Sequence, residues 1–268
     1  PETIGFYILH EGIVGYDDGE LVELSYDDIT DQKYDDRERA NLEIHEITEN
    51  GWIGFTDKYW MSTLVGEPQS KFKMASKYNE ATDIYQADIR HPLQSIGSGQ
   101  STEVKTYLFA GAKEVNTIKT YQKEADFADF IDTVDWGWFF FLTKPIFSLL
   151  DYCNKLVGNM GWAIILLTLV VKTVLLPLAY KSYVSMSKLK QLQPEMEKIK
   201  KRAGDDRMKL QQEMMALYKK EKVNPAAGCL PILLQIPIFF SLYKVLFVTI
   251  EVRHAPFIGW ITDLSAPD

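Results

Sequence analysis

The sequence predicts a multidomain membrane protein: an antiparallel β-sandwich followed by an α-helical membrane core that carries a helical hairpin. Three observations lead to this prediction. The first 112 residues contain short strand-like runs separated by turn residues. Two later windows, 160–180 and 226–250, are about as long as a bilayer is thick and hold one charged residue each. A basic segment lies between the two windows, as is typical of a loop between membrane helices.

The charge balance argues against a nucleic-acid-binding protein. The chain has a net charge of −8, from 29 Lys and Arg against 37 Asp and Glu, so it provides no general basic field for phosphates. The two cysteines, Cys153 and Cys229, lie beside different apolar windows, at ends that should face opposite compartments, which excludes a disulfide framework. The chain begins with Pro1 and an apolar run, and is expected to be a fragment of a longer protein.

Residues 1–135 are expected to form the sandwich and the helices that follow it. The strand-like runs lie at 4–9, 21–26, 42–44, 72–74, 84–89 and 104–109. Several runs alternate apolar with polar residues, and Asp17-Asp18-Gly19 is typical of a turn. From Lys113 onward the apolar residues recur at helical intervals, which predicts one or two helices. The acidic doublets near the turns lack the spacing of a calcium loop and are expected to be solvated.

Residues 136–158 are expected to form an amphipathic helix at the membrane interface. Polar residues recur at steps of four and three along one side, at Lys144, Ser148, Asp151 and Lys155. Apolar and aromatic residues fill the other side, as in helices that lie in the interface plane. The alternative is a third membrane-spanning helix, which would place these charges in hydrocarbon at a high cost.

Residues 159–180 and 226–250 are expected to span the membrane, with residues 181–222 between them in the cytoplasm. The intervening segment holds 12 Lys and Arg against 6 Asp and Glu, and short loops rich in Lys and Arg stay on the cytoplasmic side. This orientation places residues 1–158 and 251–268 on the outer side of the membrane.

The cytoplasmic segment is expected to fold as two antiparallel helices. Gly204 suits the C-cap of the first helix, Asp205 or Asp206 suits the N-cap of the second, and Pro194 should kink or restart the first helix. Five of the eight methionines lie in this segment: Met186, Met196, Met208, Met214 and Met215. They favour two interpretations equally, a flexible surface that receives varied apolar partners and simple packing between the two helices.

Lys172 lies near the middle of the first predicted span. At about 1.5 Å per residue, its Cα is about 15 Å from that of Trp162 and about 12 Å from that of Tyr180 along the helix. A lysine at mid-bilayer costs about 2.5–3.5 kcal/mol, so it should face water or polar groups. Neither span contains an acidic residue, and Thr168 adds a hydroxyl one turn earlier on the same face. A hydrated cavity is favoured, and the alternatives are an ion pair with a helix outside this sequence or a long snorkel.

The second span is expected to be bent and locally polar. Gln235 lies near its middle, and Pro231 and Pro237 each leave a backbone carbonyl without its usual donor. Lys244, near the outer end, is expected to snorkel and to have no function. The sequence has no phosphate-binding loop, no His-Glu-x-x-His and no Cys-x-x-Cys, and its four histidines are far apart, so neither an enzyme nor a bound cofactor or metal is predicted.

Several motifs resemble those of the YidC/Oxa/Alb family of membrane protein insertases, in particular its bacterial YidC type. The motifs lie at residues 136–145, 193–195, 212–218, 223–225, 228–229, 235–239, 253–257 and 263–265. The resemblance covers residues 51–268. It implies a role in inserting and folding proteins of the bacterial inner membrane, with a periplasmic β-sandwich, an interfacial helix and a five-helix core. Three core helices and an amino-terminal anchor would lie outside this sequence.

The resemblance also implies the site and the partners. Lys172 and Thr168 match positions in a hydrophilic groove open to cytoplasm and lipid, with Gln235 as a further groove residue, and the hairpin would receive substrates. Many relatives have Arg where this chain has Lys172, which keeps the charge but lacks the guanidinium fork. The implied partners are nascent membrane proteins and the lipid bilayer. The Sec translocon, the ribosome and signal recognition components are further candidates.

The residues alone leave a second class of function open. A β-sandwich anchored by two helices could be a periplasmic binding module for a carbohydrate or a translocation partner, which would need a lined cleft within residues 1–112. An enzyme is less favoured, because no nucleophile, base and metal ligands converge in the sequence.

Overall fold

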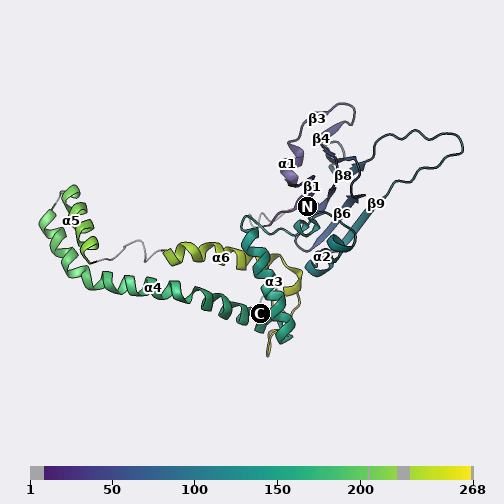
Figure 1. Ribbon diagram of the computed structural model, residues 1–268. Helices are drawn as coiled ribbons and strands as arrows, with labels where there is room; N and C mark the ends of the chain where they lie inside the picture. Colours follow the sequence, from purple (N-terminus) through teal and green to yellow (C-terminus); the bar gives the residue numbers. More distant parts are fainter. Residues whose placement is uncertain (1–8, 205, 222–229, 267–268) are drawn as a thin grey trace. The chain divides into compact units, whose positions relative to one another are not determined.

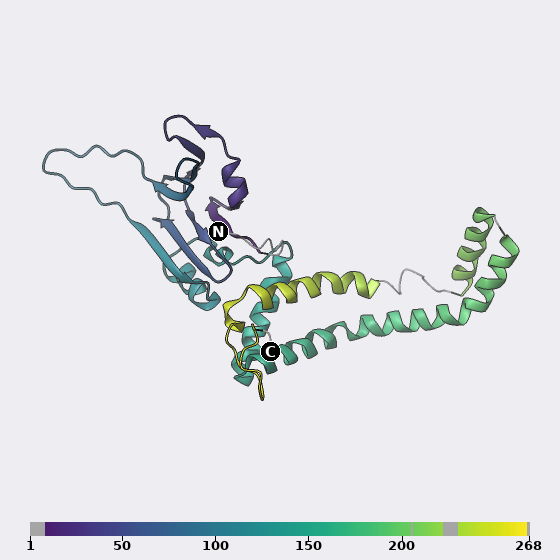
Figure 2. The ribbon, with the colours of Figure 1, turned by 180° about the vertical axis from the view of Figure 1, so that it is seen from behind.

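The computed structural model describes residues 9–204, 206–221 and 230–266, which divide into two compact units. Figure 1 shows the order of the helices and strands along the chain, and Figure 2 shows them from behind. The first unit contains the described residues up to Trp138 together with Lys244–Ala255 and the stretch from Asp263. The second contains Phe139–Tyr243 and Pro256–Thr262.

The first unit is built on two antiparallel sheets. The strands are β1 (Gly12–Asp17), β2 (Glu20–Ser25), β3 (Tyr34–Asp35), β4 (Ala40–Ile47), β5 (Gly51–Thr56), β6 (Trp60–Gly66), β7 (Phe72–Asn79), β8 (Ile84–Arg90) and β9 (Thr106–Ala112). One sheet has the order β2-β1-β5-β6-β9 and the other β3-β4-β7-β8. The antiparallel β-domain that the sequence predicts is therefore confirmed.

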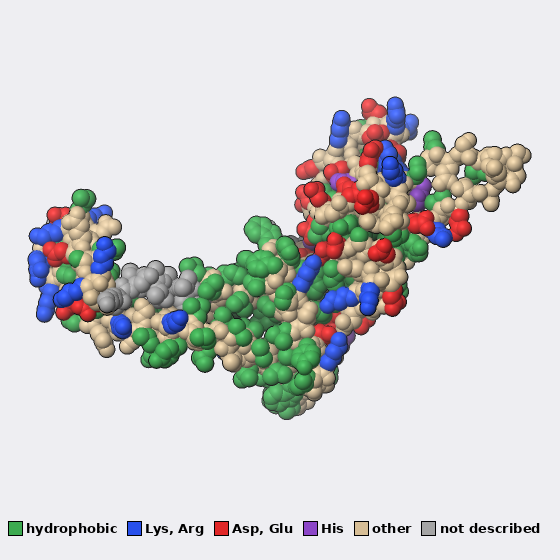
Figure 3. Space-filling view, in the orientation of Figure 1, with side chains coloured by type: hydrophobic (Ala, Val, Ile, Leu, Met, Phe, Trp, Pro, Cys, Tyr) green, Lys and Arg blue, Asp and Glu red, His purple; other side chains and the backbone are tan. Residues whose placement is uncertain are grey.

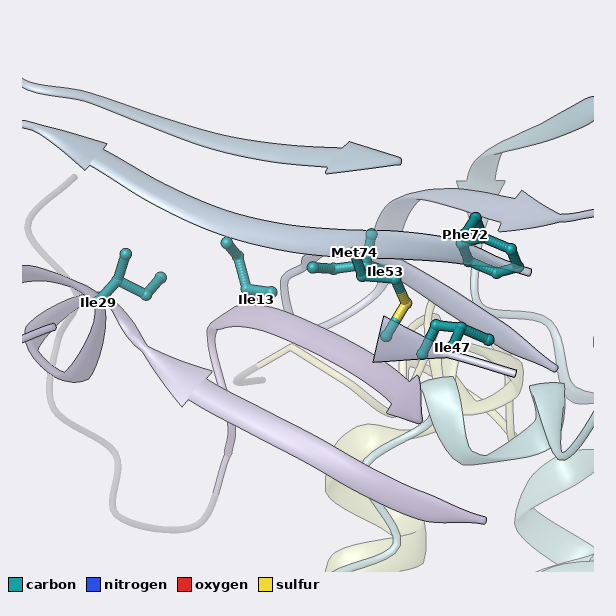
Figure 4. Packing of buried hydrophobic residues seen from close by; sticks show 6 residues of the cluster. All are labelled: Ile13, Ile29, Ile47, Ile53, Phe72 and Met74. Atoms are coloured by element: carbon teal, nitrogen blue, oxygen red, sulfur yellow. The ribbon is translucent and has the colours of Figure 1, made fainter. Parts of the chain in front are cut away.

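Apolar side chains from both sheets meet in one core (Figure 4). The short helix α1 (Tyr26–Thr30) closes one end of this core. The members are Ile13 and Ile53 from the larger sheet, Ile47, Phe72 and Met74 from the smaller sheet, and Ile29 from α1, each at most 3% exposed. Burying a side chain of this size contributes about 1.5–3 kcal/mol, so this cluster is a main source of the stability of the sandwich.

Two further helical segments, α2 (Val115–Glu124) and the 3-10 helix η1 (Phe130–Thr133), cover the other face of the larger sheet. The fully buried Trp52 of β5 donates from Nε1 to the carbonyl of Ala128 at 2.9 Å and meets the ring of Phe130 edge to face. Phe109 of β9 contacts Tyr121 of α2 in the same geometry. These segments are the helices predicted after residue 113.

The strands predicted at 21–26, 42–44, 72–74, 84–89 and 104–109 are all found, most with longer bounds. The run at 4–9 lies almost wholly outside the described residues. Four strands, β1, β3, β5 and β6, were not predicted from the sequence. In β5, Ile53 faces the core while its neighbour Trp52 faces the helices, so both faces are buried and the sequence does not alternate.

The helix α1 replaces the predicted end of the second strand. Ser25 accepts the N–H of Asp28 at 3.2 Å, and the Asp28 carboxylate accepts the N–H of Ser25 at 2.9 Å. This reciprocal pair is a capping box, which starts a helix directly after the strand.

The second unit is helical. Its helices are α3 (Phe140–Val157), α4 (Met160–Ala203), α5 (Arg207–Lys220) and most of α6 (Leu230–Val248), and the 3-10 helix η3 (Ile250–Val252) follows in the first unit. α3 packs against α4 and buries Phe147, Leu150 and the free thiol of Cys153. On its polar side Lys155 lies 2.6 Å from Asp151. The amphipathic pattern is thus confirmed, and its place at the membrane interface stays a prediction.

The first predicted span and the first hairpin helix form one continuous helix, α4, of 44 residues. Pro194 lies inside α4 without restarting it. Gly204 follows as the C-cap at φ 54°, and Asp206 caps α5 by accepting the N–H of Lys209 at 3.0 Å. The helix ends predicted from these capping residues are therefore confirmed. The predicted start of the second span, residues 226–229, lies outside the described residues.

Candidate membrane-embedded site

α4 presents an apolar surface that the described structure leaves uncovered. Asn159 fixes its start, because the side-chain Oδ1 accepts the N–H of Trp162 at 3.2 Å. The helix contains an apolar 18-residue stretch of which only 11% is buried. Between residues 160 and 180 of α4 the exposed large apolar side chains are Trp162, Ile165, Leu169, Val174, Leu176 and Tyr180. A core helix of a soluble protein would be mostly buried, so length, composition and exposure together favour a membrane span.

Among the described helices, α4 alone is long and apolar enough to cross a membrane. The part of α6 over Ile232–Val248 is apolar and shorter. Figure 3 shows apolar side chains gathered over α3, the first part of α4 and α6, while Lys and Arg gather over α5 and the end of α4. Along α4, therefore, the first part is apolar and the end is basic.

Lys172 lies within the apolar stretch of α4 and is exposed. Thr168, one turn earlier, is half-buried and donates its hydroxyl hydrogen to the carbonyl of Ile164 at 2.8 Å. The two residues share a helix face, as the spacing predicts. Because the Thr168 hydrogen is used within the helix, the hydroxyl offers a partner only its acceptor lone pairs. Within the described residues no ion pair of Lys172 is seen.

Gln235 is exposed on α6. The described residues of α4 and α6 make few contacts with each other, so the structure does not bring Gln235 to Lys172 and Thr168. Pro237 lies inside α6, as expected, whereas the side chain of Pro231 is outside the described part. The grouping of the three side chains in one groove stays a prediction.

The five methionines divide between the two interpretations. Met186, Met208 and Met215 are exposed, whereas Met196 and Met214 are half-buried. The hydroxyl of Tyr218 on α5 lies 4.0 Å from the sulfur of Met196, and Arg202 of α4 lies 3.8 Å from Glu213 of α5. α5 therefore turns back on the end of α4, with some methionines in the contact and others on the surface.

The expectation that Lys244 snorkels is wrong. Its Nζ lies 2.6 Å from Oδ2 of Asp135, and each of the two side chains is 11% exposed. The partner is 109 residues away in sequence, so no local pattern connects the pair. The only signal in the sequence is the charge itself, at the end of an apolar helix where an acidic partner from another domain can reach it.

A second charged residue that the sequence analysis did not single out is Lys113. It is 1% exposed, and its Nζ donates to the hydroxyl of Thr56 at 2.9 Å. Burial lowers the pKa of Lys113 from 10.5 to about 8, although the carboxylates of Asp135 and Asp57 act in the opposite direction. The first unit therefore contains a buried lysine close to the Asp135–Lys244 pair.

The acidic turn residue Asp18 is exposed, as expected for a solvated turn, and its carboxylate also accepts hydrogen bonds from residues 48–50. Burial raises its pKa, but hydrogen bonds from Thr48 and from the backbone N–H groups of residues 48–50 outweigh this and lower the pKa to about 2. No group of three or more His, Cys, Asp and Glu side chains suited to a metal ion is found in the described part of the chain.

Comparisons with known proteins match the two units to one family. The family profile described as "YidC periplasmic domain" matches residues 1–149, and that described as "60Kd inner membrane protein" matches residues 152–268. Three similar relatives, each named membrane protein insertase YidC, come from Dinoroseobacter shibae, Roseobacter denitrificans and Paracoccus denitrificans. They are 62%, 63% and 58% identical to this chain over 100%, 98% and 100% of its length.

The chain spans 44%, 43% and 42% of the length of these three relatives. The profile named for the periplasmic domain covers both antiparallel sheets, and the profile named for the inner membrane protein covers the uncovered apolar helix α4. The resemblance inferred from the motifs is thereby confirmed, and the chain belongs to the YidC family of membrane protein insertases.

Proposed function

We propose that the protein to which this chain belongs inserts proteins into the bacterial inner membrane and helps them to fold. Family membership supports this, because the similar relatives are named membrane protein insertases. The observation that carries the proposal is the uncovered apolar stretch of α4 with Lys172 within it. A lysine on an apolar helix is typical of a site that handles polar groups inside the membrane.

The proposed mechanism is physical rather than chemical, so the protein is neither an enzyme nor dependent on a cofactor. Lys172, Thr168 and Gln235 line a hydrated groove between membrane helices. Acidic or polar outer segments of a short membrane protein rest transiently against the ammonium group of Lys172, which shortens the hydrocarbon they must cross. Transfer of the apolar segment of the substrate into lipid then supplies the driving force.

The topology that fits this mechanism is multi-pass. Residues 159–180 and 226–250 span the membrane, residues 1–158 and 251–268 are periplasmic, and α3 lies at the outer interface. The basic segment 181–222, with 12 Lys and Arg against 6 Asp and Glu, lies in the cytoplasm.

The cytoplasmic hairpin of α5 and the end of α4 receives substrates before they enter the groove. The exposed Met186, Met208 and Met215 support this role, because flexible thioether side chains adapt to apolar segments of different shape. Its partners are nascent membrane proteins, with the Sec translocon, the ribosome and signal recognition components as further candidates.

The groove is tested by replacing Lys172 in the full-length protein with Ala or with Glu. A substrate with an acidic outer tail should be inserted about five- to thirtyfold more slowly, the change expected from losing about one to two kcal/mol, and Glu should have a larger effect than Ala. The matched control is Lys71→Ala, an exposed lysine of the β-domain outside the groove and the hairpin, which should leave insertion unchanged. Equal insertion by the Lys172 variants and the control would refute the groove role.

The hydration of the groove is tested separately. A cysteine placed at position 172, in full-length protein without Cys153 and Cys229, should react with a membrane-permeant thiol reagent that requires water. Complete protection of this thiol would instead indicate a buried structural charge.

A further inference from the structure

The loop at residues 256–262 is fixed to the start of α4, which belongs to the same compact unit. The side-chain Nδ2 of Asn159 donates to the backbone carbonyls of Pro256 and Phe257 at 3.2 and 3.1 Å. The ring of Phe257 meets that of Trp162 edge to face, with 5.5 Å between the centroids. Because Asn159 is also the N-cap of α4, one side chain both begins the helix and holds the loop.

The loop is a tight turn that presents two large apolar side chains. Phe257 donates its N–H to the carbonyl of Ile261 at 3.0 Å, and Ile261 donates its N–H to the carbonyl of Ile258 at 3.3 Å. Gly259 has a φ of 65°, in the left-handed region that favours glycine. Ile258 and Trp260 are 57% and 82% exposed, so the described residues leave most of both side chains uncovered.

Exposed apolar side chains of the neighbouring helices lie at the same helix end. Leu156 and Val157, in the last turn of α3, and Trp162, in the first turn of α4, are all exposed. Neither residues 156–171 nor residues 256–262 include a charged residue. Two segments that are far apart in sequence thus bring uncharged, apolar surface to the start of α4.

A lipid bilayer is the partner that fits this surface. The apolar, uncovered stretch of α4 begins at this end of the helix, so a membrane around that stretch has its polar interface here. Tryptophan is enriched at such interfaces, because its ring enters the acyl chains while its N–H stays at the headgroups. The loop therefore has the composition and the place of an interfacial anchor.

We propose that the loop at residues 256–262 is a membrane anchor that inserts Ile258 and Trp260 into the boundary between headgroups and acyl chains of the outer leaflet. The anchor holds the start of α4 at this depth. With Trp162 at the boundary, the Cα of Lys172 lies about 15 Å deeper along the helix, which is half of a hydrocarbon core of about 30 Å. The anchor requires only that α4 spans the membrane, whereas the use of Lys172 in insertion rests on the proposed function.

Contact with lipid is tested by spin labels on single cysteines in the full-length protein without its other cysteines, in nanodiscs of phosphatidylethanolamine and phosphatidylglycerol. A label at position 258 should collide more often with oxygen, which concentrates in lipid, than with a water-soluble nickel chelate. The matched control is a label in place of Leu93, a fully exposed apolar residue of the β-domain, which should show the reverse order.

Two outcomes of this measurement would overturn the anchor. A label at position 258 that collides mainly with the chelate would place the loop in water. A label shielded from both reagents would show that another part of the protein covers the loop.

A second measurement leaves the loop unlabelled and uses the indole of Trp260. Its fluorescence is the difference between the natural sequence and Trp260→Phe, with unbrominated lipids as the reference. Lipids brominated near the carbonyl end of their acyl chains should quench it at least about twofold more than lipids brominated near the methyl end. Absence of quenching, or stronger quenching from the methyl end, would overturn the placement at the interface.

The effect on α4 is tested by replacing both Ile258 and Trp260 with Ser and placing the spin label at position 165. Collisions of this label with the nickel chelate should rise at least about twofold, because interfacial anchors set how a membrane helix lies in the bilayer. Leu93→Ser is the matched control and should leave the collisions unchanged. Equal collisions in both variants would overturn the anchoring of α4.

None of these readouts depends on insertion. Normal insertion by the Lys172 variants would therefore refute the proposed function without touching the anchor, and a loop found in water would refute the anchor without touching the groove.

Discussion

Replacing Lys113 with Met should make the outer domain equally stable or more stable at neutral pH. The folded-state pKa of Lys113 is about 8 against an ordinary 10.5. The unfolded chain therefore binds this proton more tightly than the folded chain. The cost to folding is present in full below pH 8 and is relieved as the pH rises from 8 toward 10.5. A difference of about 2.5 pKa units corresponds to about 3 kcal/mol.

Methionine removes this cost while it fills nearly the same volume. The substitution also removes the hydrogen bond to Thr56, which is worth about 1 kcal/mol. The expected net change at pH 7 is therefore a stabilisation of up to about 2 kcal/mol. Lys113→Ala is the matched control, because it removes the same charge but leaves a cavity and should be less stable than the Met variant.

The assay is urea unfolding of the solubilised full-length protein at pH 6 and pH 9. At each urea concentration a short protease pulse measures the fraction of β-domain that is still folded. In the natural sequence, titration of Lys113 should add about 1 kcal/mol of stability between these two pH values, and this increment should vanish in Lys113→Met. A Met variant that is less stable by 2 kcal/mol or more at pH 7, with the same pH dependence as the natural sequence, would show that Lys113 is a favourable charge and refute the reasoning.

Two other substitutions test the anchoring of the turn and the loop. Asp18→Asn should destabilise the β-domain by about 1 kcal/mol at pH 7, a value reduced for the exposure of this carboxylate. Because the folded-state pKa of Asp18 is lowered to about 2, the difference should disappear as the pH falls from 4 to 2 in the same unfolding assay, and a difference that persists at pH 2 would contradict this assignment. Gly161→Ala would place a Cβ 2.1 Å from the ring of Phe257, so the loop at 256–262 should be displaced at a cost of about 1–3 kcal/mol and become sensitive to protease. Gly111→Ala, whose Cβ would make an ordinary contact at 3.6 Å, is the control, and equal protease resistance of both variants would contradict the prediction.

The parts of the fold that could be predicted are those encoded locally. Gly204 and Asp206 mark the ends of α4 and α5 because a helix end is decided by a few neighbouring residues. The polar stripe of α3 was equally visible from its spacing. β5 was not predicted, because its burial on both faces depends on α2 and η1, which lie more than 60 residues later in the sequence.

The candidate site likewise has features that follow from local sequence and features that depend on packing between distant segments. The shared face of Lys172 and Thr168 follows from helical spacing alone, and the structure agrees. Whether Gln235 joins them depends on how separate helices pack, which no local pattern specifies. The burial of Lys113 could not be predicted either, because it also depends on contacts between distant parts of the chain. A lysine between a strand and a helix is usually expected at the surface, and here residues from other parts of the first unit enclose it.

The two lysines of the apolar windows, Lys172 and Lys244, lie in different surroundings, and we expect them to have different roles. Lys244 lies near a helix end, where a carboxylate of a folded aqueous domain can reach it, and Asp135 does so at 2.6 Å. Lys172 lies within the apolar stretch of α4, about 12 residues or 18 Å from the helix start, beyond the reach of a side chain fixed at that end. Replacing Lys244 should therefore loosen the outer domain and affect every substrate alike. Replacing Lys172 should leave folding intact and discriminate between substrates by the charge of their outer tails. A Lys172 variant that slowed all substrates equally would assign both lysines to structure, and the groove would need another residue to recognise charge.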